Sequence, residues 1–319
     1  MSATAHIMPQ PFPPRSTPAG SRAGGGHATI KAVSAAPQIS RIAVVGGGFM
    51  GSGIAEAAAA AGIEVTVFEP QQAPLERSRE RLGMSVQRAV SRGKLSGEDA
   101  AGLIDRVSYT TDLDALDGAE AVVEAVVEDP RVKGELFQRL DELLPDATFL
   151  ASNTSSIPIA ELAAWTKRPE RVLGLHFFSP VPVMKLVEVV VALDTADEAV
   201  ELAESFAAGI GKQPIRTKDR SGFIVNMLLV PYLMAAVRMY EEGFASREDI
   251  DEGMRLGCGH PMGPLTLCDF IGLDVLYAVC DSLYEEFKRP EYAPPPLLKR
   301  MVVSGHHGRK AGKGFYEYS

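Results

Sequence analysis

Hydrophobic and polar positions divide the chain into a start without periodicity and a long region in which strand and helix patterns alternate. The first β-branched run is Arg41–Val45, and an Ala-rich helical stretch follows it through Ala61. Further short apolar runs predict strands at Glu64–Phe68, Val107–Thr110, Ala121–Val127, Thr148–Ala151, Val172–His176 and Leu186–Val191. Because helical spacing separates these runs, we expect an α/β fold with a doubly wound, mainly parallel sheet.

The pattern also predicts how the chain divides into domains. Residues 71–106 form a long polar insertion between the second and third strands, which we interpret as two helices. After Asp219 the periodicity becomes entirely helical. We therefore expect a larger α/β domain at 41–219, followed by a smaller all-helical domain at 220–319.

Four helices are expected in this second part. They are Arg220–Phe244, one that begins at Ser246, and two near Leu265–Phe270 and Asp274–Phe287. Pro231 should kink the first, and Ser246 with Asp249 resembles a capping box. The first helix is heavily apolar, which favours a buried interface between two copies of the chain.

Residues 1–40 show neither strand nor helix periodicity, and they contain four glycines and six prolines. Such a segment cannot bury enough apolar surface to offset its ordering entropy, so we expect a disordered tail. An organellar transit peptide is the alternative, because the segment has three basic residues and no acidic one. Its proline content disfavours the amphipathic helix of such signals, and it has no apolar region typical of secretion.

The charge distribution narrows the classes of partner. The formal net charge is −9, and without the acid-free tail the chain has 29 basic and 41 acidic residues. Such an acidic body argues against nucleic acid as the main partner. No apolar stretch reaches about 18 residues, so we expect no membrane span. Cys258, Cys268 and Cys280 have neither disulfide nor zinc-site spacing, which favours a reducing compartment and no metal.

The turn after the first strand indicates a dinucleotide site. Gly46, Gly48 and Gly51 form a G-x-G-x-x-G motif between a strand and a helix. These glycines allow a tight turn, a close approach of the backbone to a pyrophosphate and close helix packing. The second strand ends at Glu69, whose carboxylate would accept hydrogen bonds from a ribose 2′-hydroxyl and repel a 2′-phosphate. The unit predicts a Rossmann-type fold that binds NAD rather than NADP.

A histidine and a glutamate are the candidates for catalysis. His176 ends a strand, and ligands bind beyond the carboxyl ends of strands in open α/β sheets. Glu188 interrupts the next apolar strand, where an unpaired carboxylate would be costly. Pairing the two side chains would remove that cost and favour the charged imidazolium. The pattern leaves open whether this pair is catalytic or only structural. His260 lies in a turn where a structural role is favoured, and His306 and His307 are expected to face solvent.

Other polar residues lie where a ligand could reach them. The run Ser152–Ser156 follows a strand at the same edge of the sheet; Ser156 could cap the next helix, and its neighbours could hold a substrate oxygen. Asn226 stands alone among apolar residues, and a buried amide needs a partner. Arg77–Lys94 carries six basic residues and one acid, which predicts either a solvated helix face or a site for a phosphate-rich ligand.

Together these residues identify a family resemblance that covers residues 41–318. The segments GGGFMGSGIA, ASNTSSIPI, RPERVLGLHFFSPVPVMKLVEVV, SGFIVN, EDIDEGMRLGCGHPMGPL and GRKAGKGFY resemble the 3-hydroxyacyl-CoA dehydrogenase family, above all its short monofunctional 3-hydroxybutyryl-CoA dehydrogenases. The resemblance implies an oxidoreductase of β-oxidation type. It would oxidise an L-3-hydroxyacyl-CoA with NAD, or catalyse the reverse reduction of the 3-ketoacyl-CoA. It also implies a homodimer formed through the helical domain.

The resemblance also implies roles for single residues. His176 would be the general base, Glu188 would orient its imidazole, Ser155 would lie near the 3-oxygen and the nicotinamide, and Asn226 would position the substrate. The cofactor would contact Gly46, Gly48, Gly51, Glu69, Glu128, Lys133, Ser155, Ser179 and Lys310. The basic insertion would bind CoA, with Ser85 and Arg92 as the contacts.

One position departs from the family pattern. The family usually has HFFNP, whereas this chain has Ser179 in place of the asparagine. Serine is either a tolerated variant or a sign of an altered substrate, such as a 3-hydroxyacyl group on a carrier protein in secondary metabolism. A nucleotide-binding regulatory protein without activity is a further alternative, which the presence of His176 and Glu188 disfavours. We expect a cytoplasmic bacterial enzyme, or a mitochondrial or plastid one if the tail is a transit peptide.

Overall fold

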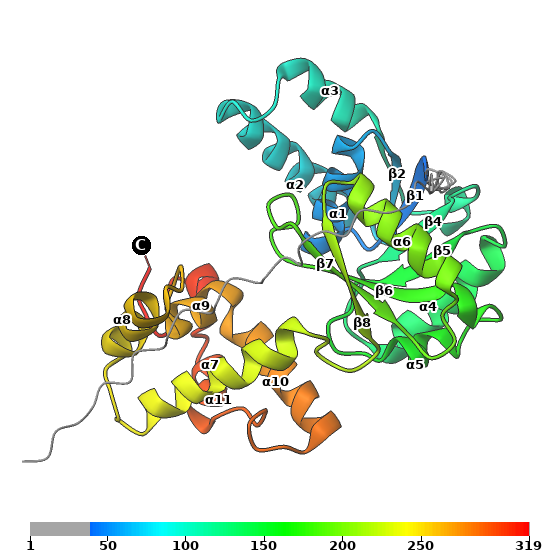
Figure 1. The fold of residues 1–319 in the computed structure, drawn as a ribbon. Helices are drawn as coiled ribbons and strands as arrows, with labels where there is room; N and C mark the ends of the chain where they lie inside the picture. The colour runs from blue at the N-terminus through cyan, green and yellow to red at the C-terminus, as the bar shows by residue number, and fades with distance from the viewer. Residues whose placement is uncertain (1–38, 319) are drawn as a thin grey trace, which may run out of the picture. The chain divides into compact units, whose positions relative to one another are not determined.

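The large sheet determines where the candidate site residues lie. The computed structural model describes residues 39–318, so our expectations for the tail up to residue 38 lie outside the described range. Within that range one sheet contains eight strands in the order β3-β2-β1-β4-β5-β6-β7-β8 (Figure 1). Their bounds are β1 Arg41–Val45, β2 Glu64–Phe68, β3 Val107–Thr110, β4 Ala121–Glu124, β5 Phe149–Ser152, β6 Val172–Phe177, β7 Leu186–Val191 and β8 Gln213–Lys218. All neighbouring strands are parallel except β6 and β7.

Helices cover both faces of the sheet, as in a doubly wound fold. One face packs against α1 Phe49–Ala60, α2 Gln72–Ser91, α3 Gly97–Asp105 and α6 Asp197–Gly209. The other face packs against η1 Leu113–Leu116, α4 Pro130–Leu143 and α5 Ile159–Ala163. Strand β1 shows the alternation that requires two layers, because Ile42 and Val44 lie in one core and Ala43 and Val45 in the other. The predicted fold class and the two helices of the insertion are confirmed.

The C-terminal part is helical and has its own hydrophobic core. It contains α7 Val225–Glu241, α8 Arg247–Cys258, α9 Pro264–Ile271, α10 Leu273–Phe287 and α11 Pro296–Val303. Two short 3₁₀ helices remain, η2 Pro169–Arg171 before β6 and η3 Arg309–Ala311 in the C-terminal part. The Ser246 hydroxyl accepts a hydrogen bond from the Asp249 N–H at 3.1 Å and caps α8, as the sequence predicts. Pro231, where we expect a kink, lies inside α7.

The structure corrects two predicted boundaries and adds one strand that was not predicted. Strand β4 ends at Glu124 rather than Val127, because the Glu124 carboxylate accepts the Val126 N–H at 2.6 Å and turns the chain away from the sheet. Helix α7 begins at Val225 rather than Arg220, because Phe223, with a φ of 48°, has a left-handed backbone that no helix can include. Strand β8 was missed because it is a half-exposed edge strand with a polar sequence. Across residues 39–318, no helix has both the length and the hydropathy needed to cross a bilayer.

Candidate active site

The glycine loop between β1 and α1 has the shape that a dinucleotide phosphate requires. Gly46 has a φ of +105°, and a Cβ there would lie 2.6 Å from the carbonyl carbon of Ala125. A Cβ on Gly51 would lie 1.9 Å from the Gly46 oxygen, so both positions exclude any larger residue. Gly48 faces open space, and α1 begins there without a side-chain cap. The N–H groups of the first turn are therefore available to an anion, and the loop fits a pyrophosphate.

Glu69 lies directly beside this loop. It follows the last residue of β2, and its carboxylate accepts a hydrogen bond from the Gly47 N–H at 2.9 Å. The carboxylate is partly exposed, and its Oε1 atom has no hydrogen-bond partner among residues 39–318. An acceptor at the end of the second strand is where a ribose hydroxyl is bound in this fold. The geometry therefore agrees with the expected preference for NAD.

His176 and Glu188 form a buried pair. They lie directly opposite each other on the antiparallel strands β6 and β7. The imidazole Nδ1 lies 2.7 Å from Glu188 Oε2, and Glu188 is 0% and His176 7% exposed. A carboxylate acceptor fixes the tautomer with hydrogen on Nδ1, so Nε2 keeps its lone pair. The described structure therefore contains the predicted His–Glu pair, and Nε2 of His176 has no hydrogen-bond partner among residues 39–318.

The helix α7 stabilises the negative charge of this pair. The other carboxylate oxygen, Glu188 Oε1, accepts hydrogen bonds from the backbone N–H groups of Ile224 and Val225, at 2.9 and 3.0 Å. These groups lie at the N-terminus of α7, where the helix dipole favours an anion. Both carboxylate oxygens of Glu188 therefore have hydrogen-bond partners, although the residue lies in an apolar strand. The rings of Phe178 and Phe223 lie 4.7 and 5.4 Å from the imidazole and limit its movement.

The loop after β5 places a network of hydroxyl groups next to β6. The Asn153 side-chain oxygen accepts the Phe177 N–H at 2.9 Å, which ties this loop to the residue after His176. The Ser155 N–H donates to Glu128 at 3.2 Å, whereas its hydroxyl has no partner among residues 39–318. Ser155 is half-buried. Its free hydroxyl is therefore able to bind a substrate oxygen.

The expected role of Ser156 as a helix cap was wrong. Its hydroxyl donates to Glu128 at 2.9 Å. The first N–H groups of α5 instead donate to the Asp219 carboxylate, from Ile159 at 2.8 Å and Ala160 at 2.7 Å. Asp219 is distant in sequence from α5, so no local pattern could reveal this cap.

Two acidic residues and a lysine form a charged cluster between β4 and α4. Lys133 is 1% exposed, and its Nζ atom lies 2.5 Å from Glu124 and 3.3 Å from Glu128. Burial raises the pKa of Glu128, but the Lys133 ammonium and the hydroxyls of Thr154 and Ser156 outweigh it, so the pKa lies below its usual value. Sequence reasoning missed Glu124, which is fully buried and also accepts the Ser152 hydroxyl at 2.6 Å. A glutamate as the last residue of an apolar strand was the available signal.

Three further expected site residues have different surroundings. Asn226 is half-buried in the first turn of α7, directly after a residue that donates to Glu188. Ser179 is exposed in the loop after β6. Lys310 forms an ion pair with Asp274 at 2.6 Å, at the start of α10, and has no contact with the glycine loop among the described residues. The structure therefore brings Asn226 close to the His–Glu pair and leaves Lys310 apart from it.

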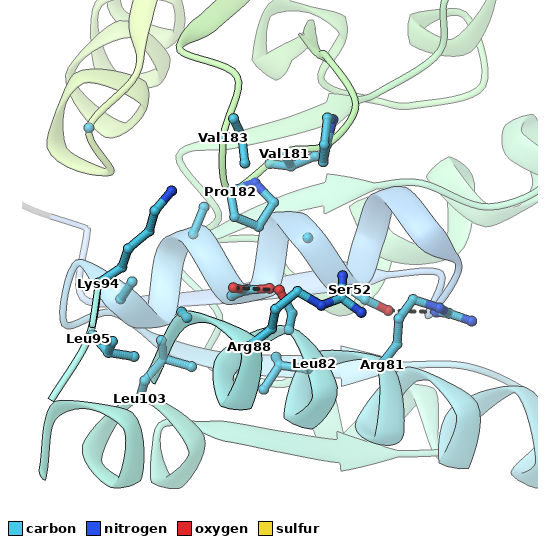
Figure 2. A pocket seen from close by; sticks show the side chains of 18 of the residues that line it. Ser52, Arg81, Leu82, Arg88, Lys94, Leu95, Leu103, Val181, Pro182 and Val183 are labelled. Atoms are coloured by element: carbon cyan, nitrogen blue, oxygen red, sulfur yellow. Dashed lines mark hydrogen bonds between the residues drawn. The ribbon is translucent and has the colours of Figure 1, made fainter. Parts of the chain in front are cut away.

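A pocket of about 820 Å³ lies between α1, α2 and the loop after β6 (Figure 2). Six cationic side chains line it, which are Arg81, Arg88, Arg92, Lys94, Lys185 and Lys212. Its wall includes Pro180 and Val181, which follow the His176-containing strand. This volume is typical of a ligand site. The basic insertion thus forms one wall of a cavity, which supports the interpretation as a phosphate-binding site over that of a solvated face.

Ser85 and the acid Glu56 lie together in this pocket. The Ser85 hydroxyl donates to Glu56 at 3.0 Å. Burial raises the pKa of Glu56, although Ser85 and Lys212 oppose the shift. Lys212 donates to the backbone oxygens of Val181, at 2.5 Å, and Met184, at 3.0 Å, and so fixes the loop that forms the wall. Sequence reasoning missed Lys212 because its partners lie about thirty residues away, beyond the range of any local pattern.

Comparisons with known proteins agree with this geometry. Residues 41–220 match the family model of the 3-hydroxyacyl-CoA dehydrogenase NAD binding domain, and residues 222–318 match that of the C-terminal domain. A 3-hydroxybutyryl-CoA dehydrogenase of Mycobacterium tuberculosis is 54% identical over 283 residues, which are 88% of this chain and 99% of that protein. No group of histidine, cysteine and acidic residues suited to a metal ion occurs within residues 39–318.

Solved structures extend the similarity to the whole described fold. The crystal structure of M. tuberculosis FadB2 superposes with a TM-score of 0.86 at 54% identity, and covers 88% of this chain and 99% of that one. The (S)-3-hydroxybutyryl-CoA dehydrogenase PaaH1 from Ralstonia eutropha has a TM-score of 0.84 at 41% identity, with 88% and 100% covered. The resemblance inferred from the sequence is confirmed, and the chain belongs to the 3-hydroxyacyl-CoA dehydrogenase family.

Proposed function

We propose that this protein catalyses the NAD-linked interconversion of L-3-hydroxyacyl-CoA and 3-ketoacyl-CoA, with 3-hydroxybutyryl-CoA as its substrate. The observation that carries the proposal is the buried pair of His176 and Glu188 at the carboxyl end of β6. The names of the two 3-hydroxybutyryl-CoA dehydrogenases support the choice of acyl chain.

In this proposal His176 is the general base. Its Nε2 atom takes the proton of the 3-hydroxyl group while the C3–H bond breaks and the C3=O bond forms. NAD supplies the hydride acceptor when it is bound. The imidazolium that results is stabilised by Glu188, which is 2.7 Å from Nδ1. General base catalysis of this kind contributes about 10²–10⁴-fold.

Neighbouring residues would position the reacting groups. The free Ser155 hydroxyl would donate to the 3-oxygen, and the Asn226 amide would bind the thioester end of the substrate. The glycine loop with Glu69 would hold the adenosine half of NAD. The nicotinamide half would lie near Glu128 and Lys133, whose charges are fixed by the cluster between β4 and α4. Lys310 would reach the cofactor only if its ion pair with Asp274 opened.

The basic pocket favours CoA as the carrier of the acyl group. Free CoA has a 3′-phosphate and a pyrophosphate, and six cations, Arg92 among them, line the pocket together with Ser85. An acyl group on a carrier protein has a single phosphodiester, which would leave most of these cations without a partner. Ser179 is the one observation that favours the alternative, because it replaces the usual asparagine.

The test is a spectrophotometric NADH assay with acetoacetyl-CoA. We expect His176→Ala to lower kcat by about 10²–10⁴-fold, because the reaction loses its acid–base group. His306→Ala is the matched control, since His306 lies in the helical part far along the chain from β6. Turnover of His176→Ala within a few-fold of wild type would disprove the assigned base. A preference for the carrier-bound substrate over acetoacetyl-CoA would favour the alternative substrate.

We also infer that the protein is a homodimer in the cytoplasm. Large apolar side chains of the helical part are exposed, including Leu228 at 73%, Phe244 at 78% and Leu256 at 74%. Exposed apolar groups of this size are typical of an interface. All three cysteines are free thiols, as expected in a reducing compartment. Light scattering after size-exclusion chromatography would test the dimer, and a mass of 34.1 kDa would contradict it.

A further inference from the structure

Arg81 contacts both the basic pocket and the nucleotide-binding loop. It lines the pocket from α2. Its Nη1 atom donates to the Gly47 carbonyl at 2.9 Å and to the Ser52 hydroxyl at 2.8 Å. Figure 2 shows the guanidinium group reaching Ser52 on α1. No other cation of the pocket donates to the glycine loop within the described residues.

The Gly47 residue is held from two sides. Its N–H group donates to Glu69 at 2.9 Å, and its carbonyl accepts from Arg81. Helix α2 also packs directly on it, since a Cβ on Gly47 would lie 3.0 Å from the Ser78 Cβ atom. Glu69 can accept a ribose hydroxyl at its free Oε1 atom while Oε2 keeps the Gly47 N–H, and Arg81 holds the Gly47 carbonyl.

The guanidinium group keeps donors for a second partner. Of its N–H-bearing atoms, only Nη1 has a hydrogen-bond acceptor within residues 39–318. Nη2 and Nε have no acceptor among these residues and are available to an anion that reaches Arg81, because a guanidinium binds phosphate oxygens in a fork. Arg81 can therefore bridge a phosphate in the pocket and the Gly47 carbonyl at the same time.

We infer that Arg81 is a positioning residue that couples the two ligand sites: a CoA phosphate bound at its free N–H groups fixes the guanidinium in its contact with the Gly47 carbonyl and thereby tightens NADH binding. This inference rests on the proposed CoA site. A loop whose contact with Arg81 is already fixed loses less entropy when the second ligand binds, so the coupling is positive. It must also be reciprocal, because NADH then tightens CoA binding by the same factor.

The test measures the dissociation constant of NADH by its fluorescence, with and without saturating free CoA, which has no acyl group to turn over. The ratio of the two constants is the coupling factor. We expect about fivefold for the wild type. Arg81→Gln should lower the factor to about unity, because no bridge remains. Arg88→Gln is the matched control: it removes the same charge from the pocket, weakens CoA binding and keeps the coupling factor.

A conservative variant and a comparison with and without CoA distinguish coupling from a purely structural effect of Arg81 on the glycine loop. Arg81→Lys should keep part of the hold on Gly47 but lose the fork, so its coupling factor should fall between the other two. If Arg81→Gln weakens NADH binding equally with and without CoA, its role is only structural and the inference is overturned. A factor of unity in the wild type with CoA bound overturns it as well. Failure of CoA to bind the wild type in a calorimetric titration would disprove the proposed CoA site, and this inference with it.

Discussion

The change Glu188→Gln tests the His–Glu pair with almost no change in shape. One carboxylate oxygen accepts the Nδ1–H of His176 at 2.7 Å, and the other accepts two backbone N–H groups at the start of α7. An amide has only one oxygen, so it can accept hydrogen bonds either from His176 or from the α7 backbone, but not from both. Leaving each of two buried N–H donors unsatisfied costs about 1–3 kcal/mol. We therefore expect the amide oxygen to face the helix and the NH₂ group to face His176.

That orientation changes the tautomer of the histidine. An NH₂ group can only donate to Nδ1, so the ring hydrogen moves to Nε2, which then cannot take the substrate proton. The cationic form also loses its carboxylate partner. Both effects act on the chemical step, so we expect kcat to fall by about 10²–10⁴-fold, or about 3–5 kcal/mol of activation free energy. The dissociation constant of NADH should change little, since Glu188 lies away from the glycine loop in sequence and in the sheet.

The assay measures kcat for acetoacetyl-CoA reduction and the dissociation constant of NADH for each variant. Glu198→Gln is the control, because it makes the same substitution at an exposed residue of α6. Circular dichroism would establish that Glu188→Gln folds. If a folded Glu188→Gln protein keeps kcat within a few-fold of the wild type, the carboxylate does not set the tautomer and the reasoning is refuted.

Three further predictions follow from other parts of the structure. Ser179→Asn should change acyl selectivity, and equal ratios of kcat/KM across a substrate panel in both proteins would count against this. Asp219→Ala removes the acceptor of two N–H groups of α5; we expect a loss of about 0.5–2 kcal/mol of stability, visible as a lower Tm, whereas an unchanged Tm would contradict the cap. The pKa of Glu128 is lowered in the folded state, so its contribution to stability is present above the usual glutamate value of 4.5 and is lost as pH falls through the folded value. Between pH 7 and pH 3 the Tm of the wild type should therefore fall more steeply than the Tm of Glu128→Gln. Equal slopes of Tm against pH would disprove the ion-pair network.

The sequence alone was sufficient for the elements whose signals are local. The glycine loop, the first seven strands and the acid at the end of β2 all lie within short windows, where spacing directly reflects backbone geometry. His176 and Glu188 could be paired because each lies in a strand whose alternation was clear, and a carboxylate in an apolar strand requires a partner. The edge strand β8 was not predictable, because its half-exposed residues carry no apolar alternation.

The tertiary structure decided every contact between segments far apart in the chain. Asp219 caps α5 in place of Ser156, the α7 backbone binds Glu188, and Arg81 of α2 holds the Gly47 carbonyl in the loop before α1. Each of these contacts depends on where a helix end or a loop lies relative to the sheet, which spacing along the chain does not specify. The sequence determined which side chains had to be buried or paired, because that follows from their chemistry. Only the packing of the helices on the sheet selected their partners, because hydrogen bonds depend on distances of a few ångströms.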